Sequence, residues 1–529
     1  MAGRLAVDFG TSNTRLAVWD QASGTASMLR LPEICEIDVW TDPDGVVHEV
    51  PCIPSVIHFD GDRELVGRQV TASGFGGSNL PFRRMKHYIS SQLELPRRVN
   101  GREVTFPDAG RAFLLRVLDF ARAQVNLEDE EVAFTVPVEA FEHYQEWLGG
   151  VCEEAGVRRY RLLDEASAAA MGYDVAVADG DTFMACDFGG GTLDVAIVRA
   201  ERRKDGGRGC RVLGKGGAEI GGARIDDWIF QDVLKASGKA PEDVRHISAL
   251  CLLEAERVKK ELTDKDESTF TVTDTQTGAV LSKRYSRTAF EDLLEEQGLF
   301  TAVKSALRAA LSRAEHMDFR QDKLRAVLLV GGSSRIPSFR RAVRQEFGQV
   351  VRYHRPLDAV AAGGAAFVGG VDLYPHIQHE YALRFYDREK QDHGFQTIVA
   401  AGTPYPSEKP VAEYTIPAVR DGQEYLGINI YEVGRKEAFG GADGGPGEIV
   451  FDPSGGARFQ RSREPEIRSR FWINEHCPTF IRADPPARKG DPRFPVQFTI
   501  DGNKRLCITV RDNETGKTLM QNYPVVKLT

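Results

Sequence analysis

The sequence predicts an α/β protein of two similar lobes, followed by an all-β domain. Three observations support this: the length of 529 residues, a glycine-rich hairpin pattern that occurs twice, and a change of pattern near residue 371. At roughly 150 residues per domain, the length allows about three or four compact units. Hydrophobic residues make up 42% of the chain and charged residues 27%, which is ordinary for a folded globular protein.

The first element is a pair of strands around a glycine-rich turn. Apolar residues alternate on both sides of Phe9–Asn13, and the same pattern returns over Asp187–Ile197. Asp8 and Asp187 stand at matching positions, and 187 minus 8 gives an offset of 179 residues. That offset is about one domain in length. We therefore expect two structurally equivalent lobes, at about 1–180 and 181–370.

The segments between and after the hairpins alternate between helical and strand patterns, which indicates mixed α/β sheets. Helical spacing is found at 111–125, 139–155, 225–236, 248–262, 287–314 and 358–368, and apolar strand runs at 132–136 and 325–330.

Helical periodicity ends near residue 371. Proline, glycine and alternating Val, Ile and Tyr residues replace it, which indicates strands and turns. We expect a short linker over 371–380 and a β domain over 381–529. The clearest strands are expected at 381–386, 424–431, 495–500 and 505–511.

Charge and cysteine content limit the function classes. The net charge of −9 provides no general positive field for nucleic acid or for an anionic membrane. Eight cysteines without a Cys-x-x-Cys pair suggest buried thiols in a reducing compartment. No apolar run reaches the 18 or so residues that a membrane span needs. We expect a cytoplasmic protein.

The two glycine-rich turns are suited to phosphate chemistry. Glycine lets backbone N–H groups approach phosphate oxygens closely, as Gly189–Thr192 would allow. Asp8 and Asp187 precede the turns, where carboxylates can hold the water shell of Mg²⁺. The strand, Gly-Gly and helix at 328–337 could admit a nucleoside, although such turns also serve plain packing.

These motifs together resemble a known family. Residues 8–13, 187–192 and 331–337, in this order and spacing, resemble the nucleotide-binding domain of the seventy-kilodalton heat-shock chaperones, within the wider actin-like ATPase group. Residues 163–170, 220–223 and 358–361 also match, so the resemblance spans about 1–370. It continues weakly at 498–502 and 513–517, which resemble strands of the family's peptide-binding sandwich.

The resemblance implies an actin-like two-lobed ATPase with duplicated, ribonuclease H-like mixed sheets, and a C-terminal sandwich-like domain. It implies ATP or ADP and Mg²⁺ as ligands, and a polypeptide client with a cochaperone or nucleotide exchanger as partners. Residues 370–376 keep only a trace of the family's acidic, leucine-rich linker. The sequence given ends at Thr529, so we expect a variant without the family's helical lid.

The resemblance also assigns roles in catalysis. Asp8 and Asp187 would bind the metal through water. Lys86 would contact the γ-phosphate and the attacking water, although one extra residue after Phe82 leaves Arg84 or His87 as alternatives. Glu165 would hold the water shell, and Asp194 is a second candidate for positioning water.

A larger set is expected to hold the nucleotide. Phosphate contacts are expected from Gly10, Thr11, Ser12, Asn13, Gly189, Gly190, Gly191 and Thr192, with Gly221 and Gly222 in a further matching motif. Nucleoside contacts are expected from Glu256, Lys259, Lys260, Thr263, Gly331, Gly332, Ser333 and Arg335. Glu256, Lys259 and Lys260 share one helix face at i, i+3 and i+4, which is also typical of a solvated surface.

Three functions fit this pattern. The favoured one is a slow ATPase of the chaperone type, whose nucleotide state governs polypeptide binding by the β domain. The second is a nucleotide-gated scaffold with one dedicated protein partner. The third, a small-molecule kinase of the same fold, is least favoured, because no acceptor-site base is found beyond the ATPase acids.

Overall fold

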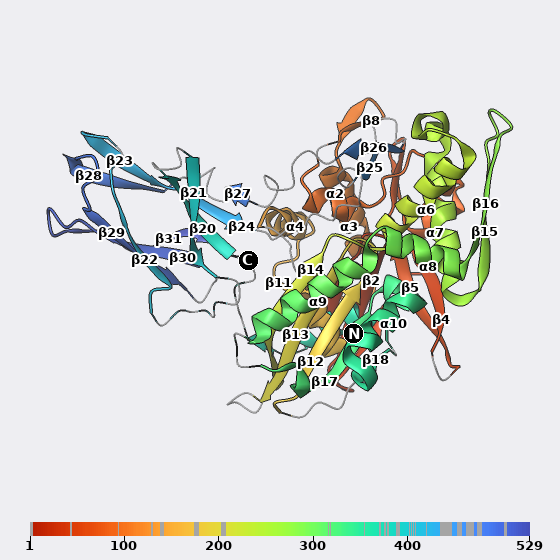
Figure 1. Cartoon of the computed structure of the whole chain (residues 1–529), viewed down its shortest axis with the longest axis horizontal. Coiled ribbons are helices and arrows are strands. Elements are labelled where there is room, and N and C mark those ends of the chain that lie inside the picture. The colour runs from red at the N-terminus through yellow and green to blue at the C-terminus, as the bar shows by residue number, and fades with distance from the viewer. Residues whose placement is uncertain are drawn as a thin grey trace. The chain divides into compact units, whose positions relative to one another are not determined.

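The structure is a computed structural model of the whole chain (Figure 1). It describes all residues except 1–3, 43–44, 94, 128–130, 138–141, 174–178, 203–207, 316, 318, 354, 370–371, 375–376, 378–379, 388–391, 401–402, 404, 406, 408, 419, 434–446, 452–456, 462–469, 473–478, 502–504 and 529. Half of the predicted linker at 371–380, and Gly502 in the matching segment 498–502, therefore lie outside the described residues.

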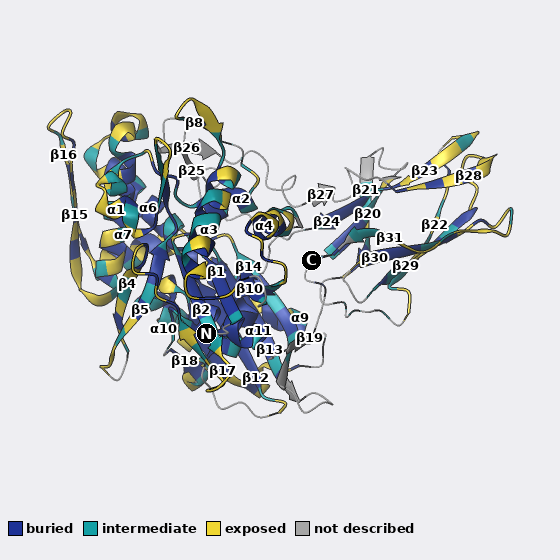
Figure 2. Ribbon diagram, turned by 180° about the vertical axis from the view of Figure 1, so that it is seen from behind, coloured by how far each residue is buried: buried dark blue, intermediate teal, exposed yellow. Residues whose placement is uncertain are grey.

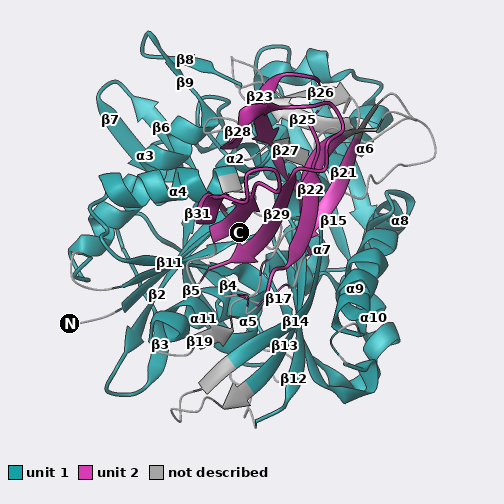
Figure 3. Cartoon of the chain, turned by 90° about the vertical axis from the view of Figure 1, so that its left-hand side faces the viewer, with its two compact units in different colours: residues 1–138, 143–373, 437–463 teal, residues 139–142, 374–436, 464–529 magenta. Residues whose placement is uncertain are grey.

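The chain divides into two compact units (Figure 3). Unit 1 comprises residues 1–138, 143–373 and 437–463, and unit 2 comprises residues 139–142, 374–436 and 464–529. No helix in the described part of the chain is long and apolar enough to cross a membrane.

Unit 1 contains two large sheets with matching cores. The first has the order β11-β10-β1-β2-β5-β4, with β3 also paired to β2. Its strands are β1 (Arg4–Phe9), β2 (Asn13–Asp20), β3 (Thr25–Met28), β4 (Glu36–Thr41), β5 (Val47–Pro54), β10 (Val132–Val136) and β11 (Tyr160–Asp164). β1 pairs antiparallel with β2 and parallel with β10, which pairs parallel with β11.

The second sheet repeats this arrangement in the order β18-β17-β12-β13-β14-β19. Its strands are β12 (Thr182–Phe188), β13 (Leu193–Arg202), β14 (Arg208–Ala218), β17 (Leu324–Val330), β18 (Val351–Arg352) and β19 (Asp372–Tyr374). β12 pairs antiparallel with β13 and parallel with β17, which pairs parallel with β18. The duplicated mixed sheets that the repeated hairpin predicts are therefore confirmed.

Helices and small hairpins complete unit 1. The helices are α1 (Arg68–Ala72), α2 (Met85–Ser90), α3 (Phe106–Arg122), α4 (Glu142–Glu154), α5 (Glu165–Gly172), α6 (Gly222–Ser237), α7 (Ser248–Asp264), α8 (Arg287–Glu296), α9 (Leu299–Glu315), α10 (Pro337–Phe347) and α11 (Ala359–Val368). The small hairpins pair β6 (Ile57–Asp60) with β7 (Arg63–Val66), β8 (Arg97–Val99) with β9 (Arg102–Val104), and β15 (Glu267–Thr273) with β16 (Val280–Ser286).

The structure of the second lobe differs from the sequence prediction in two places. The single helical stretch expected over 287–314 is two helices, α8 and α9, because Gly298 adopts a φ of 78° between them. No segment above is predicted to form the β15–β16 hairpin, which alternates exposed and buried residues along β15 (Figure 2).

Two short helices join the lobes at the centre of unit 1. α5 follows the last strand of the first sheet and packs on β12 and β13 of the second, whereas α11 packs on β1, β2 and β10 of the first. All ten residues of α11 are buried. A Cβ on Gly172 would overlap the carbonyl oxygen of Ala359, and one on Gly363 would overlap that of Ala168. Glycine therefore allows the two helices to cross in backbone contact.

In residues 374–436 and 464–529 of unit 2, every regular element that the structure describes is a strand. Its strands are β20 (Glu380–Asp387), β21 (Asp392–Val399), β22 (Ala412–Ile416), β23 (Gln423–Ile428), β24 (Ile430–Val433), β27 (Arg470–Trp472), β28 (Thr479–Ala487), β29 (Phe494–Ile500), β30 (Arg505–Arg511) and β31 (Thr518–Lys527). They form the sheets β21-β20-β24-β27, β22-β29-β30-β31 and β23-β28 around one apolar core. The strand expected over 424–431 is two strands, β23 and β24, which belong to different sheets. β25 (Gly447–Phe451) and β26 (Ala457–Arg461) pair with each other and belong to unit 1.

Candidate functional site

A cavity of about 320 Å³ in unit 1 brings most of the predicted residues together. The predicted residues that line it are Asp8, Gly10, Thr11, Ser12, Asn13, Lys86, Glu165, Asp187, Gly189, Gly190, Gly191, Thr192, Gly222, Glu256, Lys259, Lys260, Thr263, Gly331, Gly332, Ser333 and Arg335. Two predicted residues, Asp194 and Gly221, do not line it. Both hairpin turns, one from each lobe, therefore meet at the same cavity.

The two hairpin turns approach each other closely at two glycines of the second turn. A Cβ on Gly190 would lie 2.6 Å from the hydroxyl oxygen of Ser12, and one on Gly191 would overlap the hydroxyl of Thr11. Ser55 fixes the first turn, since its hydroxyl donates to the carbonyl of Gly10 at 2.8 Å and its N–H to that of Ser12 at 2.9 Å. A phosphate at this contact would reach both turns.

The second turn is held from behind by the start of α6. The N–H groups of Gly222 and Ala223 donate to the carbonyls of Gly189 and Gly190 at 3.0 and 2.8 Å. A Cβ on Gly221 would lie 2.6 Å from the carbonyl carbon and oxygen of Gly190. Gly221 therefore supports the turn from outside the cavity, whereas the resemblance had assigned it to the nucleotide.

Three acidic residues that line the cavity, Asp8, Glu165 and Asp187, form what we call its acidic floor. Asp8 is the second-last residue of β1 and accepts a hydrogen bond from Thr135 on the neighbouring strand at 2.8 Å. Burial, together with Asp194 and Asp8, raises the pKa of Glu165 to about 7, although Lys86 opposes the rise. Burial and the nearby carboxylates also raise the pKa of Asp187 well above its usual value. The carboxylates thus repel one another, and a bound cation would relieve this repulsion.

Lys86 lies on α2 and forms an ion pair with Glu165. Its side chain is buried, and although burial alone would lower the pKa of Lys86, attraction to Glu165, Tyr144 and Asp8 raises it. The lysine is therefore charged where phosphate would lie. Neither Arg84 nor His87, the two alternatives, is among the lining residues; Arg84 instead pairs with Asp227 at 2.8 Å.

Asp194 is buried beside the acidic floor. It stands opposite Asp187 in the β12–β13 register and raises the pKa values of both Asp187 and Glu165. Its effect on the cavity is therefore electrostatic, and the structure does not place it where it would line a ligand.

Half of the predicted nucleoside set, Glu256, Lys259, Lys260 and Thr263, lies along α7, and the other half follows β17. Lys259 pairs with Asp226 at 2.7 Å and donates to the carbonyl of Gly222 at 2.8 Å. Lys260 pairs with Glu256 at 2.8 Å. Burial alone would raise the pKa of Glu256, but Lys260 and Lys259 lower it to about 2. Both lysines therefore have partners on the protein, and the contacts of Lys259 hold α7 against α6.

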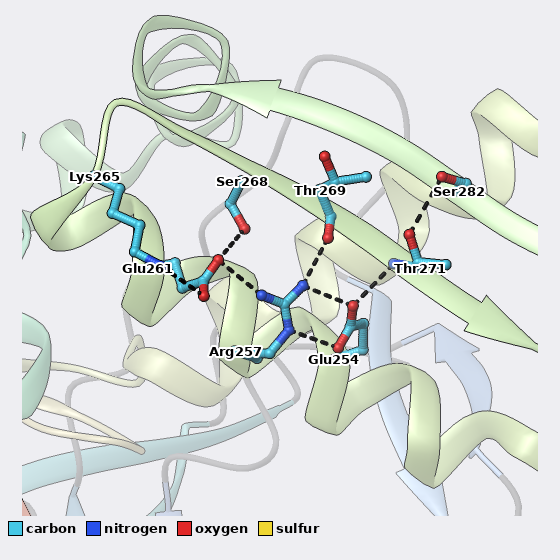
Figure 4. Close-up of polar contacts among 8 residues, drawn as sticks. All are labelled: Glu254, Arg257, Glu261, Lys265, Ser268, Thr269, Thr271 and Ser282. Carbon is cyan, nitrogen blue, oxygen red and sulfur yellow. Dashed lines mark hydrogen bonds and ion pairs between the residues drawn. The ribbon is translucent and has the colours of Figure 1, made fainter.

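The opposite side of α7 is tied to β15 by a polar network (Figure 4). Arg257 contacts Glu254 at 2.8 Å and Glu261 at 2.7 Å on its own helix, and donates to the carbonyl of Thr269 at 2.6 Å. Glu254 in turn accepts from the N–H of Thr271 at 2.9 Å. The network anchors α7 and so fixes the residues that it presents to the cavity.

Eight lining residues were not predicted: Arg15, Asp38, Val39, Asp264, Ile336, Pro356, Leu357 and Val360. Arg15 stands opposite Asp8 in the β1–β2 register, as Asp194 stands opposite Asp187. Because the offset of 179 residues relates Arg15 to Asp194, the repeat could have indicated Arg15 as a lining residue. Asp38 and Val39 lie on β4, which no motif marked.

The cavity suits a hydrated divalent cation. In the described part of the chain, no group of three or more His, Cys, Asp or Glu side chains is placed to ligate one ion directly. Buried carboxylates with raised pKa values nevertheless face the cavity. Mg²⁺ keeps several of its waters in proteins, and these acids could accept hydrogen bonds from such waters.

Comparisons with known proteins agree with this geometry. The family described as Hsp70 protein matches residues 98–384, which is more than half of the 529 residues. A Chaperone protein HscA homolog of Shewanella piezotolerans is 26% identical over 554 aligned residues, covering 98% of this chain and 78% of the relative. Another, from Bordetella petrii, is 26% identical and covers 96% of this chain and 76% of the relative.

The family match covers β17, the glycine-rich element after it and the hairpin that contains Asp187. The two relatives cover both units. Taken with the duplicated sheets and the cavity between their hairpins, these matches show that the chain belongs to the Hsp70 family of ATP-binding chaperones, with an ATPase of the actin-like fold.

Proposed function

We propose that this protein hydrolyses ATP with Mg²⁺ in the cavity of unit 1, and that its nucleotide state controls polypeptide binding by unit 2. The observation that supports this most is the contact between the Thr11–Ser12 and Gly190–Gly191 turns beside a buried Lys86. Such a site acts by positioning and charge neutralisation, and it needs no covalent nucleophile.

In this proposal each group has a defined task. The two turns would bind phosphate oxygens through backbone N–H groups. Asp8 and Asp187 would hold Mg²⁺ through its waters, and the ion would neutralise phosphate charge. Lys86 would stabilise the charge that develops on the γ-phosphate, and Glu165, with a pKa of about 7, could accept a proton from water near neutral pH.

The proposal for unit 2 rests on the relatives, because their names identify them as chaperones and the matches extend over the β strands. The experiment measures binding of a fluorescent unfolded peptide to the full-length protein in ATP and in ADP. We expect faster peptide release in ATP, and loss of that difference when Asp187→Asn weakens ATP binding. Equal release in both nucleotides would contradict the coupling.

The alternative function is a nucleotide-gated scaffold for one dedicated protein. It would be favoured if no unfolded peptide bound in either nucleotide while a single cellular protein co-purified in stoichiometric amount. Release of that protein by ATP would then show that the ATPase governs docking to a partner and not general peptide binding.

A further inference from the structure

The hairpin of β4 and β5 forms an unpredicted wall of the cavity. Asp38 and Val39 from β4 line the same cavity as Arg335 and Ile336, which follow β17 in the second lobe. Val39 is 54% exposed, so its side chain is free to contact a ligand in the cavity. A purine base has two flat faces of low polarity. Val39 on one wall and Arg335 on another could each pack against one face of such a base.

The next residue, Trp40, attaches this hairpin to the other lobe. Trp40 is only 3% exposed, and its ring meets that of Tyr353 edge-on, with centroids 5.8 Å apart and an interplanar angle of 68°. Tyr353 directly follows β18, the edge strand of the second sheet. The guanidinium of Arg340 on α10 lies 4.7 Å from the Tyr353 ring centroid. An aromatic contact thus spans the two lobes.

The rest of the hairpin is held lightly. β5 pairs with β2 only at Asn13–Pro54 and Thr14–Ile53. Val46 and Val47, near its turn, are 53% and 61% exposed. Asp38, two residues before Trp40 on β4, is tied to Arg15 on β2 at 2.5 Å. The hairpin is therefore fixed up to Asp38 and again at Trp40, and release of Trp40 would free the hairpin from Val39 to its turn.

We propose that the β4–β5 hairpin is a strap over the nucleoside end of the cavity, latched by Trp40 on Tyr353, and that this latch sets the rate of nucleotide release. The proposal rests on the proposed nucleotide site and assigns Trp40 a positioning role. A nucleotide could leave only after the edge-on contact opens. Hydrolysis would not depend on the latch, because Lys86 and the acidic floor lie on other elements.

The test compares dissociation of a fluorescent ADP analogue with single-turnover ATP hydrolysis in the full-length protein. Trp40→Ala is expected to speed dissociation about 10-fold or more and to change the hydrolysis rate less than about 2-fold, because the strap opens but the phosphate turns stay in place. Tyr353→Leu is expected to have the same effect, and the double variant no more than either single one. Trp40→Phe should restore much of the slow release.

Val47→Ala is the matched control, since Val47 lies on the same hairpin and is mostly exposed. Unchanged dissociation in Trp40→Ala and Tyr353→Leu would overturn the strap. An equal loss of hydrolysis in these variants would also overturn it, because that would indicate general damage to the site. If the wild-type protein bound no nucleotide, the proposed function itself would fail, and the two failures are thus distinguishable.

Discussion

Lys86 and Glu165 form an ion pair inside the cavity, although they come from different elements 79 residues apart. Both side chains are almost fully buried, with 5% and 9% of their surfaces exposed. A buried pair of this kind contributes little net stability but holds both groups in fixed positions. Both groups line the same cavity as the two glycine-rich turns, which suits the role in hydrolysis that we propose for them.

Replacing Lys86 should therefore impair chemistry more than binding. We expect Lys86→Ala to reduce single-turnover ATP hydrolysis by on the order of 10²-fold, because the charge that stabilises the transition state is lost. ADP affinity, measured by calorimetric titration, should change little. His87→Ala is the matched control, since His87 is adjacent and does not line the cavity. An unchanged hydrolysis rate in Lys86→Ala would refute the assignment.

The raised pKa of Glu165 has a consequence for stability. Between pH 4.5, its ordinary pKa, and about 7, the folded protein keeps a proton that the unfolded chain has released. Raising the pH through this window therefore favours unfolding. In the absence of nucleotide and divalent ions, the melting temperature of wild type should fall more steeply across this window than that of Glu165→Gln. Parallel curves for the two proteins would contradict the raised pKa.

The backbone contact of Gly221 with Gly190 predicts a strong effect from one added methyl group. Gly221→Ala should weaken ATP binding by about 10-fold or more, because the new Cβ would displace the second phosphate turn. Gly150→Ala on α4, where no atom lies within 4 Å of the added Cβ, should leave binding intact. Equal affinity in the two variants would show that the turn does not need its close support.

Unit 2 contains a buried ion pair whose loss should destabilise it alone. Arg493 is 2% exposed and binds both oxygens of Asp512, at 2.6 and 2.7 Å. Asp512→Ala removes the buried partner of this guanidinium and leaves it only the half-exposed carboxylate of Glu514, which should lower the free energy of unfolding by about 3–5 kcal/mol. Glu514 is the half-exposed partner of Arg493, so Glu514→Gln should lower the free energy of unfolding by about 1 kcal/mol or less.

Calorimetry can assign this loss to unit 2. The unfolding transition that ADP does not shift should move to lower temperature in Asp512→Ala, while the transition that ADP stabilises should remain in place. A downward shift of the ADP-stabilised transition instead would mean that the two units do not unfold separately.

Repetition made much of the fold predictable. The Asp-Phe-Gly pattern recurs after 179 residues because both lobes use the same hairpin, and short apolar runs mark β1 and β12 directly. The β4–β5 hairpin carries no such motif, and its place beside the cavity depends on Trp40 meeting Tyr353 more than 300 residues away. Contacts of that range leave no local pattern in the sequence.

The candidate site was predictable where residues act through a shared backbone motif, as at the two turns. The roles of Gly221 and Asp194 could not be separated from those of their neighbours, because a motif does not show which side of a turn faces the ligand. Only the packing of Gly221 on the Gly190 carbonyl and the burial of Asp194 behind the acidic floor distinguish them.

Unit 1 is proposed to bind ATP through a metal held by buried acids. The most direct measurement is calorimetric titration of ATP into the full-length protein, in Mg²⁺ and in EDTA, for wild type and Asp187→Asn. We predict one ATP per chain in Mg²⁺, with affinity at least about 10-fold weaker in EDTA, and a much smaller difference for Asp187→Asn. Equal wild-type affinity with and without the metal would contradict the account.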